Sequence, residues 1–375
     1  MTLIIRLMAA KTKRKRTENM QQPDAAQELM LSHSDPEAKQ LYDLAIQVKK
    51  LAPWRWMEET DAFGLENPDT GDLGFVSVMG YIGEYEAVAV YLGAAGLYAF
   101  MDLHTDESAS ADRLFEMPHL QAAFSDREYL EKEDRDLIKQ LGLKFRGANA
   151  WPMFRSYRPG YMPWFVTRAE ASFLIHALSQ TLDVAKRVRD DPQPIRPVRR
   201  VEKGGHWVRA AHKEGAELVW EDQVWSIPRP QAAPPAPIVD SDALEPLKHV
   251  PRSNLDVEMD LLRTPGAIAE PGQRPLVVYL LMFADSDSGL ILGVEVMTAA
   301  ESLGAMHAGI PNALVKLLLQ NQVVPKRLLV RSELLRGLLR NLTQSLNIEL
   351  RHADELPSID EAAQAMNESM FGGTF

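Results

Sequence analysis

The sequence of 375 residues contains no cysteine. Disulfides, thiol nucleophiles, cysteine-ligated zinc and iron–sulfur clusters are therefore excluded. A chain that does without disulfides suits a reducing compartment, so we expect a cytoplasmic location. No other pattern calls for a cofactor, and none is expected.

Long apolar runs are also missing. No uncharged stretch approaches the roughly 20 residues that a membrane-spanning helix needs, so no transmembrane segment is expected. Residues 1–10 are largely apolar, but the basic run 11–16 follows them. A secretory signal carries its positive charge before the apolar part, so this order does not predict export.

Signatures of common enzymes are absent as well. The sequence has no Gly-x-Ser-x-Gly, His-Glu-x-x-His or P-loop pattern, and its nine histidines lack metal-ligand spacing. Gly80 and Gly83 lie between two expected strands, which favours a hairpin turn over a dinucleotide-binding loop. His176 stands alone on a helical face and is typical of a structural histidine. These absences point away from an enzyme.

The net charge of −11 limits the choice of partner. An acidic protein repels phosphate, so nucleic-acid binding would require a local basic patch. Residues 186–203 carry seven basic and three acidic side chains and form such an island. An exposed connector is the favoured interpretation, and nucleic-acid contact is the alternative. Protein is the expected partner class, and the sequence leaves the oligomeric state open.

Length and composition predict two domains. Residues 1–34 are polar and charged without a period, and we expect a disordered basic tail there. The first domain is expected over 35–227, and it includes a small β ribbon at 205–227. Proline-rich residues 228–252 predict a stiff linker, and the second domain is expected over 253–375.

The first domain is predicted to combine an antiparallel meander with packed helices. Asp35 and Pro36 are typical of a helix start, and apolar residues at helical spacing follow them. Turn signals divide residues 62–92 into three strands. Residues 104–144 are charged and predict a solvated helix rather than a calcium loop. Thr167 and the glutamate three residues later predict a further capped helix.

The second domain is predicted to form a mixed sheet with helices packed on it. Residues 253–263 are expected to be a short helix, and residues 275–284 and 290–297 a strand hairpin. The order then continues as helix, helix, strand, helix, strand, helix, with Thr298 as the expected first cap. This order loosely resembles the ribonuclease H-like superfold with one strand too few. The fold class expected for the whole chain is α+β.

Carboxylates of the second domain raise the alternative of a metal-dependent nuclease. Nucleases of the ribonuclease H-like superfold hold magnesium between carboxylates, because two metal ions bracket the phosphate. Asp285 lies in a predicted turn, and the middle of the first predicted strand has no acid. A divergent or degenerate nuclease is therefore the alternative, and no metal is expected. The candidate ligands are Asp285, Glu333 and Asp360, together with Glu295.

Residues 151–165 are furthest from average composition, with six aromatics, three prolines and two arginines. The prolines exclude a regular helix, so an irregular loop is predicted. One interpretation is a site where stacking and charge hold a flat or anionic ligand. The favoured interpretation is a loop that closes the core, with its arginines paired to acids from 126–136. The ligand-binding candidates are Arg155, Tyr157, Arg158, Tyr161 and Trp164.

Several motifs resemble those of known families. Residues 275–370 resemble an uncharacterised bacterial domain. This domain can occur in the same protein as a domain of a second uncharacterised family. Relatives can carry a cysteine-rich metal-binding motif at the C-terminus, which this chain lacks. The resemblance implies a two-domain bacterial cytosolic protein and transfers no catalytic residue. The motifs that resemble the other family, one of bacterial proteins of unknown function, are Leu51–Trp56, Asp69-x-Gly71, Val78–Gly80, Val90–Gly93 and the Trp-Pro-x-Phe-Arg-Ser-Tyr-x-Pro-Gly-Tyr-x-Pro pattern of 151–163.

These observations favour a non-enzymatic cytosolic module for binding or protein interaction. Its paired domains, stiff linker and missing catalytic patterns all agree with that reading. The first alternative is a divergent metal-dependent nuclease or nucleic-acid-associated protein. The second is a binder of a small anionic ligand through residues 151–165.

Overall fold

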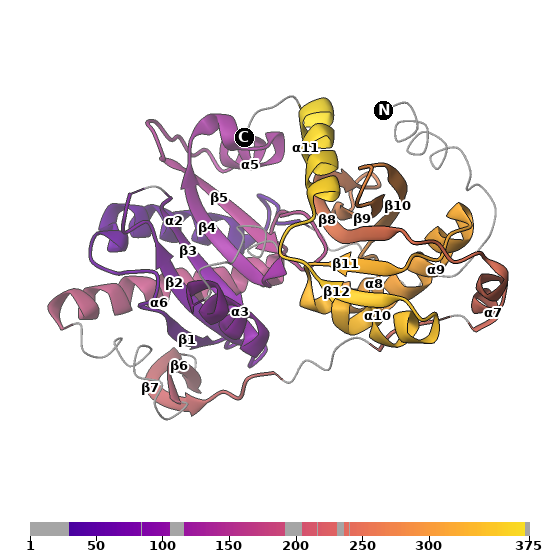
Figure 1. The fold of residues 1–375 in the computed structure, drawn as a ribbon. Helices are drawn as coiled ribbons and strands as arrows, with labels where there is room; N and C mark the ends of the chain where they lie inside the picture. The colour runs from indigo at the N-terminus through magenta and orange to yellow at the C-terminus, as the bar shows by residue number, and fades with distance from the viewer. Residues whose placement is uncertain are drawn as a thin grey trace.

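The computed structural model describes residues 30–83, 85–105, 116–191, 205–215, 217–230, 236–239 and 241–371. These residues form two sheets, each with helices packed on it, and Figure 1 shows the sheets side by side. The fold class is α+β, as predicted. No helix within these ranges is long and apolar enough to cross a membrane. Residues 1–29 of the predicted tail and most of the basic island lie outside the described residues.

The first sheet has seven strands in the order β5-β4-β3-β2-β1-β6-β7. Strands β1, β2 and β3 form the predicted antiparallel meander, and β4 and β5 continue it. β6 pairs with β1 in parallel and with β7 in antiparallel orientation, so the ribbon extends the same sheet. The strands are β1 (Phe63–Glu66), β2 (Leu73–Met79), β3 (Ala87–Leu92), β4 (His119–Ser125), β5 (Trp151–Tyr157), β6 (Gly205–Glu214) and β7 (Glu217–Ser226).

Helices α2 (Pro36–Leu51) and α6 (Arg168–Asp190) cover one face of this sheet, and α3 (Gly93–Thr105) packs on the other. The helix starts predicted at Asp35–Pro36 and at Thr167 are present. α2 begins after Asp35 with proline in its first position. At the start of α6, the hydroxyl of Thr167 accepts from the amide of Glu170, whose carboxylate accepts from the amide of Thr167. α5 (Lys132–Gln140) is the predicted charged helix.

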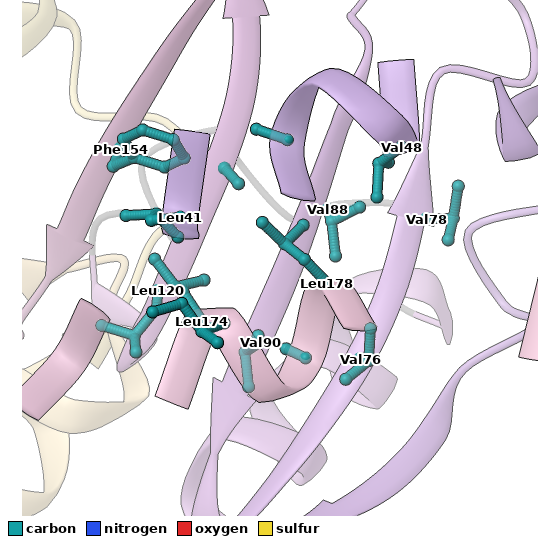
Figure 2. Close-up of a cluster of buried hydrophobic side chains, with 14 of the residues drawn as sticks. Leu41, Val48, Val76, Val78, Val88, Val90, Leu120, Phe154, Leu174 and Leu178 are labelled. Atoms are coloured by element: carbon teal, nitrogen blue, oxygen red, sulfur yellow. The ribbon is translucent and has the colours of Figure 1, made fainter. Parts of the chain in front are cut away.

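Apolar side chains of α2 and α6 meet the inward-facing side chains of the strands and form the larger core (Figure 2). They are almost completely removed from solvent. Burying a side chain of this size contributes about 1.5–3 kcal/mol relative to leaving it exposed. The labelled core residues are Leu41, Val48, Val76, Val78, Val88, Val90, Leu120, Phe154, Leu174 and Leu178.

The second sheet has five strands in the order β10-β9-β8-β11-β12. β8, β9 and β10 are antiparallel neighbours, whereas β11 is parallel to both β8 and β12. α9 and α10 cover one face and α11 covers the other. The elements are β8 (Asp256–Ile268), β9 (Leu276–Asp285), β10 (Ile291–Thr298), α8 (Leu303–Ala308), α9 (Ile310–Asn321), β11 (Arg327–Val330), α10 (Glu333–Ser345), β12 (Glu349–His352) and α11 (Pro357–Phe371).

Four expectations about local structure were wrong. The helix expected at 253–263 is the strand β8, where acidic and apolar residues alternate with the period of two that a strand requires. β4 was missed within the charged region 104–144. The first half of 151–165 is the strand β5 rather than a loop, because an edge strand accepts its proline. α8 is capped by Ser302 instead of Thr298.

Candidate functional site

The aromatic stretch 151–165 divides into a strand and a segment that reaches the second sheet. After β5 ends at Tyr157, residues 158–165, here called the connector, leave the first sheet. The amide of Met162 donates to the carbonyl of Pro275 at 2.9 Å, and the amide of Val277 donates to the carbonyl of Gly160 at 3.0 Å. The connector therefore pairs with the start of β9 like a short antiparallel strand.

The connector lies on the same side of β9 as β10 and continues the row of residues that pair with β9 there. β10 ends where Thr298 pairs with Val278 of β9, and the connector pairs with the two residues that precede Val278. Further contacts hold it there. The guanidinium of Arg274 donates to the carbonyl of Ser156 at 2.9 Å. The side chain of Met162 packs against an apolar cluster that lies mainly on the second sheet and α8.

Arg155, a candidate ligand-binding residue, is buried in an ion pair. Its guanidinium donates to both carboxylate oxygens of Asp134, at 2.9 and 2.6 Å, and lies 4.7 Å from the ring centre of Phe165. The pairing expected with the acids of 126–136 is thus found for this arginine. An adjacent cavity of about 50 Å³ is far below the roughly 300 Å³ of a ligand pocket.

Arg158 pairs instead with Glu170 of α6, at 2.9 Å. The same carboxylate accepts from the hydroxyl of Ser156 at 2.7 Å and from the amide of Thr167. Burial raises the pKa of Glu170, but these hydrogen bonds outweigh burial and the pKa falls below its usual range. Glu170 therefore stays ionised and fastens the connector to the start of α6.

Tyr157 stacks on His119, with ring centres 4.0 Å apart and planes 11° from parallel. Its hydroxyl donates to the side-chain oxygen of Gln121, which also accepts from Tyr85. Burial raises the pKa of Tyr157, so the hydroxyl remains protonated. Burial also lowers the pKa of His119 to about 4, against a weaker opposing hydrogen bond to the carbonyl of Met117.

His119 should make the stability of the first sheet depend on pH. The folded protein binds the proton less well than the unfolded chain, so this contribution is complete above pH 6.5 and is lost toward pH 4. We expect it to fall by about 2 kcal/mol between pH 6.5 and 5. Urea denaturation at several pH values gives the free energy of unfolding of the wild type and of His119→Gln. The slopes of these free energies against pH should differ. Equal slopes would contradict the prediction.

The five candidates from 151–165 therefore do not surround a common space. The side-chain polar groups of Arg155, Tyr157, Arg158 and Tyr161 have their own protein partners, which lie on different elements. The hydroxyl of Tyr161 donates to the carbonyl of Ala300 at 3.4 Å. Trp164 pairs through its backbone with Ser156 at the end of β5. What the stretch does together is to join the two sheets.

The candidate carboxylates of the second sheet also lie apart. Asp285 accepts hydrogen bonds inside its own turn, from Ser288 at 2.6 Å among others. Glu333 pairs with Arg336 one turn further along α10. Glu295 pairs with Lys316 of α9 at 2.6 Å. In the part of the chain that the structure describes, no three His, Cys, Asp or Glu side chains are placed to hold a metal ion.

Asp360 takes part in a cluster that the sequence did not reveal. Arg331, directly after β11, donates through Nε to Asp260 of β8 at 2.7 Å and through Nη2 to Asp360 of α11 at 2.6 Å. The guanidinium thus lies between the two carboxylates. Asp260 was missed because its segment was expected to be a helix, although the alternation of acidic and apolar residues over 256–261 was a signal of a strand.

The basic island is only partly described. Residues 186–190 form the last turns of α6, and residue 191 follows them. Arg187 is paired with Asp222 of β7 and lies over the ring of Trp207. This part of the island therefore fastens the ribbon to α6.

β10 is the edge of the second sheet, and its outer side borders a groove. Every residue of β10 is partly exposed. The groove has a volume of about 350 Å³ and lies between β10, α8 and α9. The ammonium of Lys316 is the more exposed member of its pair with Glu295, since their side chains are 49% and 19% exposed. The groove is lined by Glu295, Val296, Met297, Thr298, Ala305, Met306, Gly309, Asn312, Ala313 and Lys316.

The fold and these contacts define a two-part α+β protein whose sheets are joined by the connector. Residues 39–202 match the family described as domain of unknown function DUF7309. Residues 243–367 match the family described as domain of unknown function DUF6930. The chain therefore combines two distinct domains of unknown function, as the resemblance of its motifs implied. Comparison with curated proteins found no match.

Proposed function

We propose that this protein is a non-enzymatic interaction module that binds an extended segment of a partner protein along the free edge of β10. The observation that carries this proposal is an apolar edge strand next to an open groove. An edge strand presents unpaired backbone N–H and C=O groups, and an added strand satisfies them.

The composition of β10 supports this use of its edge. The strand has eight residues, of which Glu295 alone is charged. Other described edge strands carry features that discourage pairing. β12 has four residues, two of them the charged pair Glu349 and Arg351. β5 contains Pro152, and the connector covers its end through Trp164. β7, the other edge of the first sheet, carries three acidic residues, whereas β10 has none of these protections.

The connector provides a precedent within the same molecule. It is an extended segment that adds to β9 through backbone hydrogen bonds, in the row that β10 continues. A partner segment would lie along the outer side of β10 in the same manner. We therefore favour an extended peptide over a small molecule.

The lining of the groove indicates the chemistry of that peptide. Met297 and Met306 offer flexible apolar surface, to which side chains of several shapes can adapt. The side chain of Lys316 is half exposed, and its ammonium, which bonds to Glu295, has further donors that favour an acidic side chain. We therefore propose a segment that carries an acidic residue near an apolar anchor residue.

The alternatives have less support. The guanidinium groups of Arg155 and Arg158 are bound to Asp134 and Glu170, so neither is offered to an anionic ligand. Arg331 lies between the carboxylates of Asp260 and Asp360 and bonds to both. Cleavage of DNA or RNA by the full chain with magnesium would favour the nuclease instead. The cysteine-free composition supports a cytoplasmic location, and the resemblance of the motifs supports a bacterial origin, as part of the proposal.

The test uses a phage-displayed library of eight-residue peptides, selected against the full chain. We expect selected peptides to combine an apolar residue with an acidic one and to protect β10 amides from hydrogen exchange. Ala305 is exposed in the groove, so Ala305→Trp should fill it and weaken binding at least about tenfold, a change of about 1.4 kcal/mol. Fluorescence anisotropy with the selected peptide measures the affinity.

Gln320→Trp is the matched control, because Gln320 is exposed on α9 and does not line the groove. Its affinity should equal that of the wild type. The proposal fails if no peptide is selected, or if the selected peptide binds Ala305→Trp as tightly as the control. Self-association that Ala305→Trp abolishes would assign the edge to a second copy of the chain and also overturn it.

A further inference from the structure

We propose that docking of the connector onto β9 controls the affinity of the β10 groove for its peptide. This inference rests on the proposed function and adds a means of regulation. The row along β9 has two occupants, β10 and the connector, and they meet at the end of the groove. A displacement of the connector can therefore alter the position of the neighbouring end of β10.

Shared side chains provide the physical link. Met306 and Met297 line the groove, and both also belong to the apolar cluster on which Met162 packs. Ala299, the residue after β10, is only 1% exposed, and the backbone of Gly160 lies against it. Departure of the connector would remove packing from this cluster and expose it to water. Met297 and Met306, which line the groove, would then lose packing partners and become less ordered.

The connector is suited to reversible docking. Its pairing with β9 consists of two backbone hydrogen bonds, supported by Arg274 and Tyr161. The chain itself does not enforce this contact, because residues 227–255 separate β7 from β8. If docking of the connector raises the affinity for the peptide by some factor, binding of the peptide must raise the docking equilibrium constant by the same factor.

One substitution should undock the connector. Gly160 has φ +84°, and a Cβ atom there would lie 2.4 Å from the Cβ of Ala299. Gly160→Ala therefore combines backbone strain with a collision at the junction. The control is Gly71→Ala, because Gly71 has φ +78° but no atom within 4 Å of such a Cβ. Both variants place alanine at a positive φ, but only Gly160→Ala also brings a Cβ atom against Ala299.

A second substitution should lock the connector. Tyr161 and Leu276 face each other between the two backbone hydrogen bonds, as a non-hydrogen-bonded antiparallel pair. Such pairs have Cα atoms about 4.5 Å apart, within the range of a disulfide. Because the chain has no cysteine, Tyr161→Cys with Leu276→Cys gives a single possible disulfide.

Two measurements separate docking from binding. Hydrogen exchange at the amide of Val277, which donates to Gly160, reports docking without any peptide. Anisotropy with the peptide selected against the wild type reports binding. We expect Gly160→Ala to speed this exchange and to weaken the peptide at least about fivefold. The oxidised cysteine pair should bind at least as tightly as the wild type, and Gly71→Ala should match the wild type.

The outcomes distinguish this inference from the proposed function. If Gly160→Ala speeds exchange while the affinity changes less than about twofold, the regulation is wrong and the binding site stands. Weaker binding by the oxidised cysteine pair than by its reduced form would also overturn it. If Ala305→Trp has no effect on the peptide, the proposed site itself fails and the regulation fails with it.

Discussion

Replacing Asp134 by asparagine is expected to lower the free energy of unfolding of the first sheet by about 3–5 kcal/mol, because it leaves a buried guanidinium without its counter-ion. The side chains of Arg155 and Asp134 are 9% and 7% exposed. Asp134 also accepts from the amide of Glu131 and so caps α5. Loss of the carboxylate therefore weakens a helix start as well as the ion pair.

A double-mutant cycle isolates the ion pair from the cap. Arg155→Met should cost nearly as much as Asp134→Asn, and the double variant should cost clearly less than the sum. Tryptophan fluorescence during urea denaturation suits the measurement, because all seven tryptophans lie at or before residue 225. The signal then reports the first sheet and its ribbon.

An exposed pair on the same helix is the control. Lys132 and Asp136 of α5 lie 2.7 Å apart, with side chains 78% and 48% exposed. Asp136→Asn should change the free energy of unfolding far less than Asp134→Asn does, since solvent screens such pairs. Equal costs for Asp134→Asn and Asp136→Asn would show that burial of the first pair contributes nothing.

The same buried pair illustrates what could be predicted from the sequence. The starts of α2 and α6 were predictable because their signals are local, as in Asp35–Pro36 and Thr167 with Glu170. The acids of 126–136 were correctly suggested as partners of Arg155. Arg158 was different, since its partner Glu170 was already assigned to a helix cap.

The role of the connector could not be predicted, because it depends on residues far away in the sequence. Met162 and Pro275 are separated by more than one hundred residues, and no local pattern joins them. β10 was predicted as a strand, but its position at an edge follows from the strand order of the whole sheet. The groove beside β10 therefore could not be predicted from the sequence.

Replacing Arg331 by methionine is expected to lower the free energy of unfolding of the second sheet by about 3 kcal/mol, at the lower end for a broken buried pair. The guanidinium joins β11, β8 and α11, because it bonds to Asp260 and Asp360 together. Asp260 is 7% exposed and would be left without its counter-ion. Asp360 is about half exposed, and water replaces much of its bond.

The measurement must exclude the first sheet. The second sheet contains no tryptophan, so hydrogen exchange of β11 amides follows its unfolding. Arg331→Lys should recover only part of the loss, since one ammonium cannot reproduce the two directed contacts of a guanidinium. Faster exchange should extend from β11 to the start of α11.

Arg351→Met provides the matched comparison. Arg351 lies on the neighbouring strand β12, is about half exposed and pairs with Glu349 on the same strand. It joins no separate elements, so its removal should cost less than about 1 kcal/mol. If Arg331→Met costs no more than Arg351→Met, Arg331 does not hold α11 on the sheet.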